Sequence, residues 1–241
     1  MPAIPAPQDL HPALWLGHQL GRTRLDGVAS GFAALDVQLP GGGWPRRALT
    51  ELLLPHPGIG EMRLLAPALA AAQRGGRLVM LFDPPAQLSA WALAQLGLDV
   101  AQLLVVQTRQ GAQPGGNDGL WAVEQALKSG HVGALLAWLP PRLRAERLRR
   151  LQLAAQAHDG AAFVMRESAA AERPSAAPLR LALHAAGADA LALRLLKRRG
   201  PPLEAPITLA LPPVLSAPAR ARRRPAGHPA ALPAATFVDI G

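Results

Sequence analysis

The chain of 241 residues is half hydrophobic and 17% charged, so it can bury a sizeable core and is not globally disordered. Because it contains no cysteine, a disulfide scaffold, thiolate metal sites and thiol catalysis are excluded. The first ten residues lack the basic start and apolar run of a signal peptide, and no stretch is apolar enough to span a bilayer. We therefore expect a cytoplasmic protein with no membrane partner.

The net charge of +9 is carried almost entirely by arginine, since only Lys128 and Lys197 are lysines. An excess of positive charge favours polyanionic partners such as nucleic acid. An uneven charge that sits mostly in a tail would give the same total, so the charge alone does not decide the function.

Short apolar segments alternate with amphipathic ones over most of the chain. We predict strands at 49–54, 77–82, 103–107, 132–139 and 161–166, and helices at 62–74, 86–96, 120–129 and 143–158. Strands that are apolar on both faces are typical of a parallel sheet covered by helices on both sides. Residues 179–185 and 191–197 flank Gly187-Ala188-Asp189 and predict an antiparallel hairpin at the end of this α/β core.

Three regions differ in composition. Residues 1–26 form an N-terminal segment whose short amphipathic stretch around Trp15 is too short to be stable alone, so Trp15 is a candidate contact for a partner or for a second copy of the chain. Residues 27–211 form the core. Residues 212–241 are rich in Ala, Pro and Arg without periodicity and predict a disordered tail, in which Phe237 and Ile240 are candidate partner contacts.

The turn after the first strand lies where an α/β fold places a phosphate-binding loop. A working loop, G-x-x-x-x-G-K-[ST], cradles phosphates with backbone N–H groups, neutralises them with its Lys and holds Mg²⁺ with its hydroxyl. Here Glu61 takes the Lys position and Met62 the hydroxyl position, and Arg63 is the nearest cation. The degenerate loop comprises Pro55, Pro57, Gly58, Gly60, Glu61 and Met62.

Stretches on either side of this loop resemble the RecA recombinases. Residues 28–36 and 41–51 look like the run-in to the recombinase phosphate loop, and 70–77, 94–104 and 127–132 are similar to later passages of that core. The resemblance extends over roughly residues 28–199 in the right order. It implies a RecA-like core, with a mostly parallel sheet flanked by helices on both faces.

The departures from the recombinase pattern coincide with its catalytic positions. The resemblance places Trp138 where recombinases have an Asp that assists Mg²⁺, and Pro85 where they have the Glu that activates water. Arg166-Glu167 stands where they keep a Gln that senses the γ-phosphate, and the segments that hold DNA in recombinases are cut short. We therefore expect a protein that is not an enzyme and has no cofactor.

Among degenerate relatives, the chain most resembles the ImuA family, on its length, Leu14-Trp15-Leu16-Gly17, the Gly-Gly-Gly-Trp-Pro turn and the defective loop. The resemblance implies an accessory role in SOS-induced translesion DNA synthesis, beside an inactive Y-family polymerase relative of the ImuB type and an error-prone replicative-type polymerase. Contact with RecA or with a second copy is a further possibility. Two alternatives stay open: a SulA-like inhibitor that binds the tubulin-like division protein, and a residual ATP-binding ATPase.

Polar residues outside the loop give weaker signals. The seven histidines have no spacing typical of a metal site, so we expect no metal. Asp83 ends the second predicted strand and is either a remnant acid or the cap of a helix from Ala86. Dense basic runs favour weak, non-specific DNA contact without base stacking. The candidates for this contact are Arg198, Arg199, Arg220, Arg222, Arg223 and Arg224.

Overall fold

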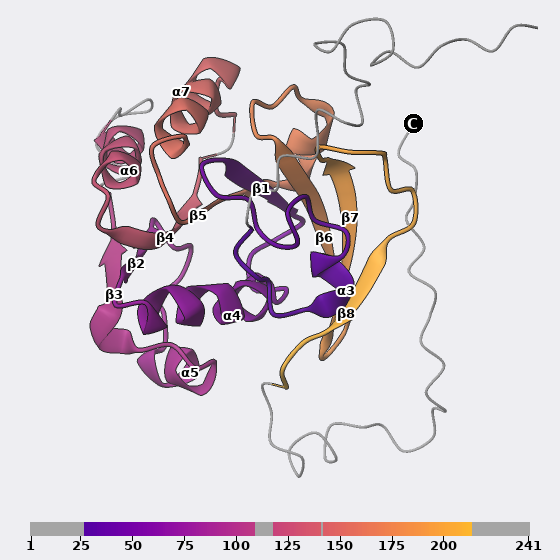
Figure 1. Cartoon of the computed structure of the whole chain (residues 1–241), viewed down its shortest axis with the longest axis horizontal. Coiled ribbons are helices and arrows are strands. Elements are labelled where there is room, and N and C mark those ends of the chain that lie inside the picture. Colours follow the sequence, from indigo (N-terminus) through magenta and orange to yellow (C-terminus); the bar gives the residue numbers. More distant parts are fainter. Residues whose placement is uncertain (1–26, 109–117, 141, 214–241) are drawn as a thin grey trace, which may run out of the picture.

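An eight-stranded sheet runs through the computed structural model of the protein, which describes residues 27–108, 118–140 and 142–213 (Figure 1). Its strand order is β3-β2-β4-β5-β1-β6-β7-β8. The strands β1 to β6 run parallel, while β7 and β8 are antiparallel to their neighbours, as the sequence predicts for the core and its hairpin. The strands are β1 (Leu49–Leu54), β2 (Leu78–Phe82), β3 (Leu103–Val106), β4 (Val132–Trp138), β5 (Ala161–Glu167), β6 (Leu179–Gly187), β7 (Ala190–Lys197) and β8 (Ile207–Ala210).

Helices cover both faces of the sheet (Figure 1). One face carries α4 (Glu61–Arg74) and α5 (Ala90–Gln95), and the other carries α6 (Asp118–Lys128) and α7 (Ala145–Ala155). The short helix α3 (Ala33–Asp36) lies near β8, and 3₁₀ turns occupy Val100–Gln102 and Ser168–Glu172. Among the described residues, no helix has the length and apolarity needed to cross a membrane.

The core is split into two layers because the central strands are buried on both faces. Every residue of β1 and of β4 is buried, which explains why their sequences are nearly continuous apolar runs. Trp44 packs edge-on against Phe163 of β5 with ring centroids 5.2 Å apart. Gly43 lets the segment around Val28 pair closely with Trp44, since a Cβ at Gly43 would lie 2.4 Å from the carbonyl oxygen of Val28. The Gly-Gly-Gly-Trp-Pro turn thus anchors the segment before β1 to the sheet.

Two helices are shorter than the sequence predicts. The helix expected over 86–96 begins only at Ala90, because Ser89 is its N-cap and accepts a hydrogen bond from the N–H of Ala92. The helix expected over 143–158 is α7, which begins at Ala145 because Arg144 is its N-cap, with an extended backbone (ψ of 140°), and which ends at Ala155.

Two elements are absent from the sequence-based prediction. The four-residue strand β8 pairs antiparallel with β7, but its short segment between prolines carries no recognisable period. The one-turn helix α3 lies within a stretch that its glycines and prolines mark as turns. After β8, Leu211 is buried and the carbonyl oxygen of Pro212 accepts a hydrogen bond from Arg63, so the ordered contacts of the core reach Pro212.

Candidate functional site

The degenerate loop folds around its own acidic side chain. Glu61 is the first residue of α4 and is only 3% exposed. Its Oε1 accepts a hydrogen bond of 2.7 Å from the N–H of Gly58, and its Oε2 accepts one of 3.1 Å from the N–H of Gly60. Backbone N–H groups at a helix N-terminus are the donors that would otherwise hold a phosphate. The carboxylate of Glu61 therefore occupies donors that a nucleotide would need.

Both glycines of this loop adopt backbone angles that permit the turn. Gly58 and Gly60 have φ of 86° and 121°, in a region that strains any residue with a side chain. A Cβ at Gly60 would also lie 2.7 Å from Leu211, which packs over the loop from the end of β8. The frame of a phosphate loop is thus retained, while its donors point at Glu61.

Arg63, the nearest cation to the loop, is held by the turn between β6 and β7 and by the segment after β8. Its Nη1 lies 2.8 Å from Oδ1 of Asp189 and 3.1 Å from the carbonyl oxygen of Pro212, and its Nη2 donates to the carbonyl oxygen of Ala188. These contacts join α4 to the hairpin turn between β6 and β7. Arg63 therefore joins the loop end of α4 to the rest of the core, and its guanidinium, which lies beside Gly60, is already occupied by these three partners.

The strand ends beside the loop carry the residues that replace the recombinase acids. Trp138 ends β4 and is buried, and its indole N–H has no hydrogen-bond partner among the described residues. Asp83 has a left-handed φ of 50°, and its two carboxylate oxygens accept from the N–H and the hydroxyl of Thr108, each at 2.7 Å. The expectation that Asp83 caps a helix from Ala86 is wrong, since the carboxylate fastens the end of β2 to the segment after β3.

Sequence reasoning missed a buried charged cluster on the neighbouring strands. Glu51 in the middle of β1 is fully buried, and its Oε1 lies 2.9 Å from Nη1 of Arg166 on β5. Its Oε2 lies 2.5 Å from Nε of Arg180 on β6, and Arg180 also donates to the carbonyl oxygen of Ala170. Nε and Nη2 of Arg166 have no hydrogen-bond partner in the described part of the chain. The one available signal was a Glu in a central strand whose other residues are apolar except for Thr50.

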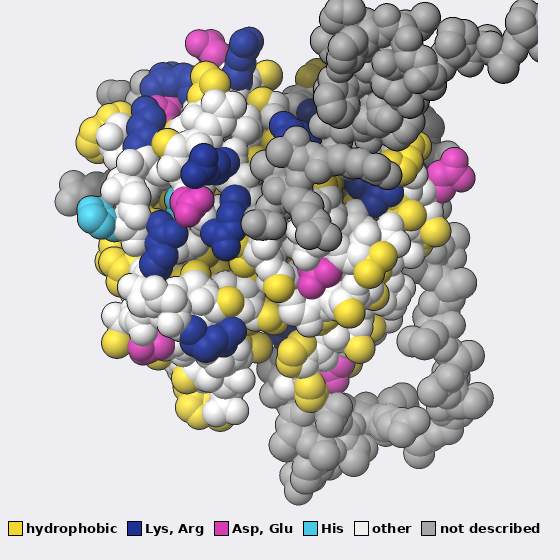
Figure 2. Space-filling view, viewed as in Figure 1, with side chains coloured by type: hydrophobic (Ala, Val, Ile, Leu, Met, Phe, Trp, Pro, Cys, Tyr) yellow, Lys and Arg dark blue, Asp and Glu magenta, His cyan; other side chains and the backbone are white. Residues whose placement is uncertain are grey.

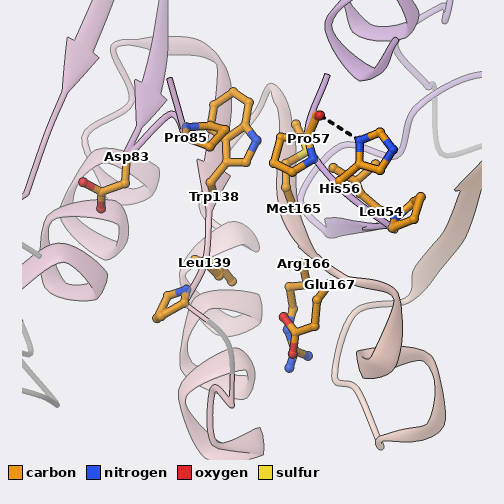
Figure 3. A pocket seen from close by; sticks show the side chains of 12 residues that line it. Leu54, His56, Pro57, Asp83, Pro85, Trp138, Leu139, Met165, Arg166 and Glu167 are labelled. Atoms are coloured by element: carbon orange, nitrogen blue, oxygen red, sulfur yellow. Dashed lines mark hydrogen bonds between the residues drawn. The ribbon is translucent and has the colours of Figure 1, made fainter. Parts of the chain in front are cut away.

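A pocket of about 330 Å³ opens where β1, β2, β4 and β5 end (Figure 3). Trp138 and Pro85 lie together at one end of it, and Arg166 and Glu167 lie at the other. Between them the walls are mainly apolar. The full lining is Leu54, Pro55, His56, Pro57, Asp83, Pro85, Trp138, Leu139, Pro140, Met165, Arg166 and Glu167.

The predicted DNA contacts fall mostly outside the described residues. Arg199 is exposed, whereas Arg198 is half-buried and donates from Nε to the carbonyl oxygen of Pro201 and from Nη1 to that of Gln38. The other candidates for DNA or partner contact lie outside the residues that the structure describes: Trp15, Arg220, Arg222, Arg223, Arg224, Phe237 and Ile240.

Basic side chains also gather at the amino ends of the parallel strands, on the face between α4 and α7 (Figure 2). Arg46 donates to the carbonyl oxygen of Asp159, and Nε of Arg47 lies 3.5 Å from Oδ1 of Asp159. Arg77 donates to the carbonyl oxygen of Gly130. These residues precede different strands, so no run in the sequence marks them as one surface.

The described residues include no group of three or more His, Asp or Glu side chains that could hold a metal ion.

The phosphate loop, filled by Glu61, and the mainly apolar pocket both lie at the carboxyl ends of the parallel strands. A parallel sheet of this order, with a phosphate-type loop between β1 and α4, defines the RecA-like class of α/β folds. The match of residues 12–137, about half of the chain, to the family model of the RecA N-terminal domain agrees with this class. The chain belongs to the RecA family.

Individual relatives are similar over about half of the chain. The protein is 32% identical to Protein RecA of Thermus aquaticus over 118 residues, which is 49% of this chain and 33% of that relative. It is 31% identical to Protein RecA of Symbiobacterium thermophilum over 121 residues and 32% identical to that of Chlorobaculum parvum over 117 residues. The chain thus spans about a third of the length of these relatives. The resemblance to RecA is confirmed, and the narrower resemblance to the ImuA family stays a prediction.

Proposed function

We propose that this protein is a RecA-like accessory protein that acts in translesion DNA synthesis without hydrolysing nucleotide. Its partners in this role are an inactive Y-family polymerase relative of the ImuB type and an error-prone replicative-type polymerase. The observation that carries the proposal is the pair of hydrogen bonds from Gly58 and Gly60 to the Glu61 carboxylate. A phosphate could take these donors only by displacing a buried, hydrogen-bonded carboxylate of the same charge sign.

A second observation favours a role in binding other proteins. Among the described strands β3 pairs only with β2, so no described strand covers its outer edge, and Leu104 and Val105 of β3 are exposed. Trp91 on α5 and Trp121 on α6, the helices nearest this edge on either face, are 71% and 60% exposed (Figure 1). An open strand accepts a strand from a partner, and tryptophan is enriched among residues that dominate binding energy.

The partner is tested by co-purification. The tagged protein should retain an ImuB-type protein, and the double variant Leu104→Lys with Val105→Lys should lose it, because charges on an edge strand oppose strand addition. The variant Leu153→Lys, on the exposed side of α7, is the matched control and should retain the partner. Retention of the tubulin-like division protein instead would replace this proposal by the SulA-like alternative.

The absence of hydrolysis is tested by restoring the loop. The variant Glu61→Lys with Met62→Thr recreates the Lys and hydroxyl of a working loop. It should still show no ATP hydrolysis above a protein-free blank, because Pro85 provides no base for water and Trp138 no ligand for Mg²⁺. Hydrolysis by the unaltered protein would contradict the proposal outright.

A further inference from the structure

Basic side chains are concentrated where the parallel strands begin. The five residues before each of β1 to β5 are all described, and together they contain five Lys or Arg and two Asp side chains. Because parallel strands start at the same end of a sheet, these side chains come from distant parts of the chain to one face of the molecule (Figure 2). We call this surface the basic face; it comprises Arg46, Arg47, Arg74, Arg77 and Lys128.

The two acids at this end of the strands neutralise little of the positive charge. Asp99, before the outer strand β3, accepts hydrogen bonds from the N–H of Ala101 and from Nε2 of Gln102. Asp159 lies 3.5 Å from Nε of Arg47, and both side chains of this pair are more than half exposed, so water and salt screen their attraction. The basic face therefore keeps a surplus of positive charge.

Backbone carbonyl groups hold two of the arginines in place without neutralising them. Arg46 donates from Nη1 to the carbonyl oxygen of Asp159, and Arg77 donates from Nη2 to that of Gly130 at 2.9 Å. A guanidinium has five N–H donors, so most donors of both groups remain for a ligand. A side chain that is already positioned loses less conformational entropy when it binds.

Arg46 and Arg77 lie near each other although they precede different strands. Burial lowers the pKa of His158 to about 4, and the charges of Arg77 and Arg46 act in the same direction, so both guanidinium groups are close to this ring. His158 precedes β5, which lies between β4 and β1 in the sheet. Because the imidazole is uncharged at neutral pH, the arginines set the charge of this part of the face.

The length of the basic face suits a row of phosphates better than a single anion. Arg77 precedes β2 and Arg47 precedes β1, and these strands are three steps apart in the order β2-β4-β5-β1. At about 4.8 Å between neighbouring strands, three steps are about 14 Å. Each strand of a DNA duplex carries a phosphate about every 3.4 Å along the axis, or about four over this length.

The composition of the face favours nucleic acid over an acidic protein. Interfaces between proteins have an apolar core with aromatic side chains, whereas interfaces with nucleic acid are more polar and more positively charged. Among the exposed large apolar residues of the described ranges, only Leu78 lies at the start of β1, β2, β4 or β5. Trp44, the one aromatic residue among the five before each of these strands, is buried, so the face offers no ring for base stacking.

We propose that the basic face binds the phosphate backbone of nucleic acid without reading its sequence, with Arg46, Arg47 and Arg77 as the central contacts. The face lies at the opposite ends of the strands from the phosphate loop. It also differs from the basic runs at 198–199 and 220–224 that the sequence marks. The inference concerns the folded core and depends neither on the role in translesion synthesis nor on a partner protein.

The proposal is tested by fluorescence anisotropy of a labelled DNA duplex of about 20 base pairs, titrated with the full chain between about 50 and 200 mM salt. Arg47→Gln with Arg77→Gln removes two phosphate contacts. Binding should weaken by at least about tenfold at about 50 mM salt, and the slope of log K against log salt should become shallower by about two units.

The matched control removes the same charge at the other end of the strands. Arg142 follows β4, and Arg173 lies 3.7 Å from Glu167 at the carboxyl end of β5; both arginines are exposed. Arg142→Gln with Arg173→Gln should weaken binding by less than about threefold, because these positions are outside the proposed contact.

A second variant separates binding from folding, since Arg77→Gln removes the contact with Gly130. Arg47→Gln with Arg74→Gln changes two exposed side chains and should weaken duplex binding by at least about fivefold at an unchanged melting temperature. The contribution of the C-terminal arginines is separated by repeating the titrations in a full chain with Gln at four positions. The basic-face variants should lose the same factor in this chain, which has Gln in place of Arg220, Arg222, Arg223 and Arg224.

Two further probes define the ligand. A second duplex of unrelated sequence should bind within about twofold of the first, because the backbone is the same. Poly-L-glutamate, with at most about one charge per 3.3 Å against about one per 1.7 Å in the duplex, should displace the labelled duplex at least about tenfold less well than unlabelled duplex does.

Four results would overturn the proposal. They are duplex binding by Arg47→Gln with Arg77→Gln as tight as by the unaltered protein, an equal loss in the control, a difference of more than about tenfold between the two duplexes, and displacement by poly-L-glutamate as effective as by duplex. The last result would indicate an acidic segment of a protein as the partner of this face.

Discussion

The phosphate loop and the end of β5 both lie at the carboxyl ends of the parallel strands. Each contains a buried charged side chain, but the two side chains differ in how many of their hydrogen bonds are made. At the loop, the Glu61 carboxylate receives a hydrogen bond for each of its oxygens. At the end of β5, the Arg166 guanidinium is just as buried, yet two of its nitrogens have no partner among the described residues. The first site is filled by the chain itself, and the second is left with unused donors.

The difference shows that a RecA-like core that departs from the catalytic pattern can balance one buried charge with its own backbone and leave another only partly paired. At the loop, Glu61 occupies the N–H groups of Gly58 and Gly60, which a bound phosphate would need. The surplus positive charge of Arg166 and Arg180 around the single carboxylate of Glu51 is an arrangement that costs folding stability. Three of the predictions below test the two halves of this comparison through the free energy of unfolding, and one concerns a buried histidine at the amino ends of the strands.

The largest effect is expected for Glu51, the only acid in the buried cluster. Glu51→Gln leaves the guanidinium groups of Arg166 and Arg180 buried without a counter-charge. We expect a loss of about 3–5 kcal/mol in the free energy of unfolding, measured by urea denaturation. Glu172→Gln, the same substitution at an exposed position, should change it by less than about 0.5 kcal/mol. Equal effects of the two variants would show that the cluster is not buried in solution.

Acid should lower the free energy of unfolding through His158, which lies at the amino ends of the parallel strands. Burial lowers the pKa of His158 from 6.5 to about 4, so the unfolded chain binds its proton at a higher pH than the folded one. The contribution of His158 to the free energy of unfolding is fully present above about pH 6.5. It falls by about 3 kcal/mol as the pH approaches 4, because a shift of one pKa unit corresponds to about 1.4 kcal/mol. In His158→Gln, the change in the free energy of unfolding between about pH 6.5 and pH 4, measured by urea denaturation at each pH, should be smaller by that amount. A variant that follows the same pH curve as the unaltered protein would exclude His158 as the cause.

Removal of the carboxylate from the filled loop should have a smaller but clear cost. Glu61→Ala leaves the N–H groups of Gly58 and Gly60 without their acceptor and removes an anion from the N-terminus of α4. We expect a loss of about 2–3 kcal/mol in the free energy of unfolding. Glu146→Ala, in the exposed first turn of α7, should cost less than about 0.5 kcal/mol. If Glu61→Ala is as stable as the unaltered protein, the carboxylate does not fill the loop.

The smallest effect is expected at the site with unused donors. Arg166→Gln removes the surplus charge and retains an amide donor for Glu51. The free energy of unfolding should change by less than about 1 kcal/mol, and a gain is compatible with the account. A loss as large as that of Glu51→Gln would show that Arg166 is fully paired in solution, which would remove the contrast between the two sites.

Much of the fold could be predicted from the sequence because its signals are local. Apolar runs of strand length, closed by glycine or proline turns, mark β1, β2, β4 and β5 to within one or two residues of their observed ends. The short strand β8 could not be found in this way, since it depends on pairing with β7 rather than on its own pattern.

The candidate site could be predicted only where one stretch of sequence contains it. The loss of the phosphate loop is visible in Glu61 and Met62, although the sequence does not reveal that the carboxylate turns back onto Gly58 and Gly60. The buried cluster was missed because Glu51 lies 115 positions from Arg166 and 129 from Arg180. Such a cluster is created by the order of strands in the sheet, which no local spacing encodes.

The central claim, that Glu61 takes the place of a bound phosphate, is tested most directly by isothermal titration calorimetry with Mg²⁺-ATP. The account predicts no saturable heat of binding for the unaltered protein, because the donors of the loop are occupied and its cation is missing. Saturable, Mg²⁺-dependent binding with a dissociation constant tighter than about 100 μM, equivalent to roughly −5.5 kcal/mol, would contradict it.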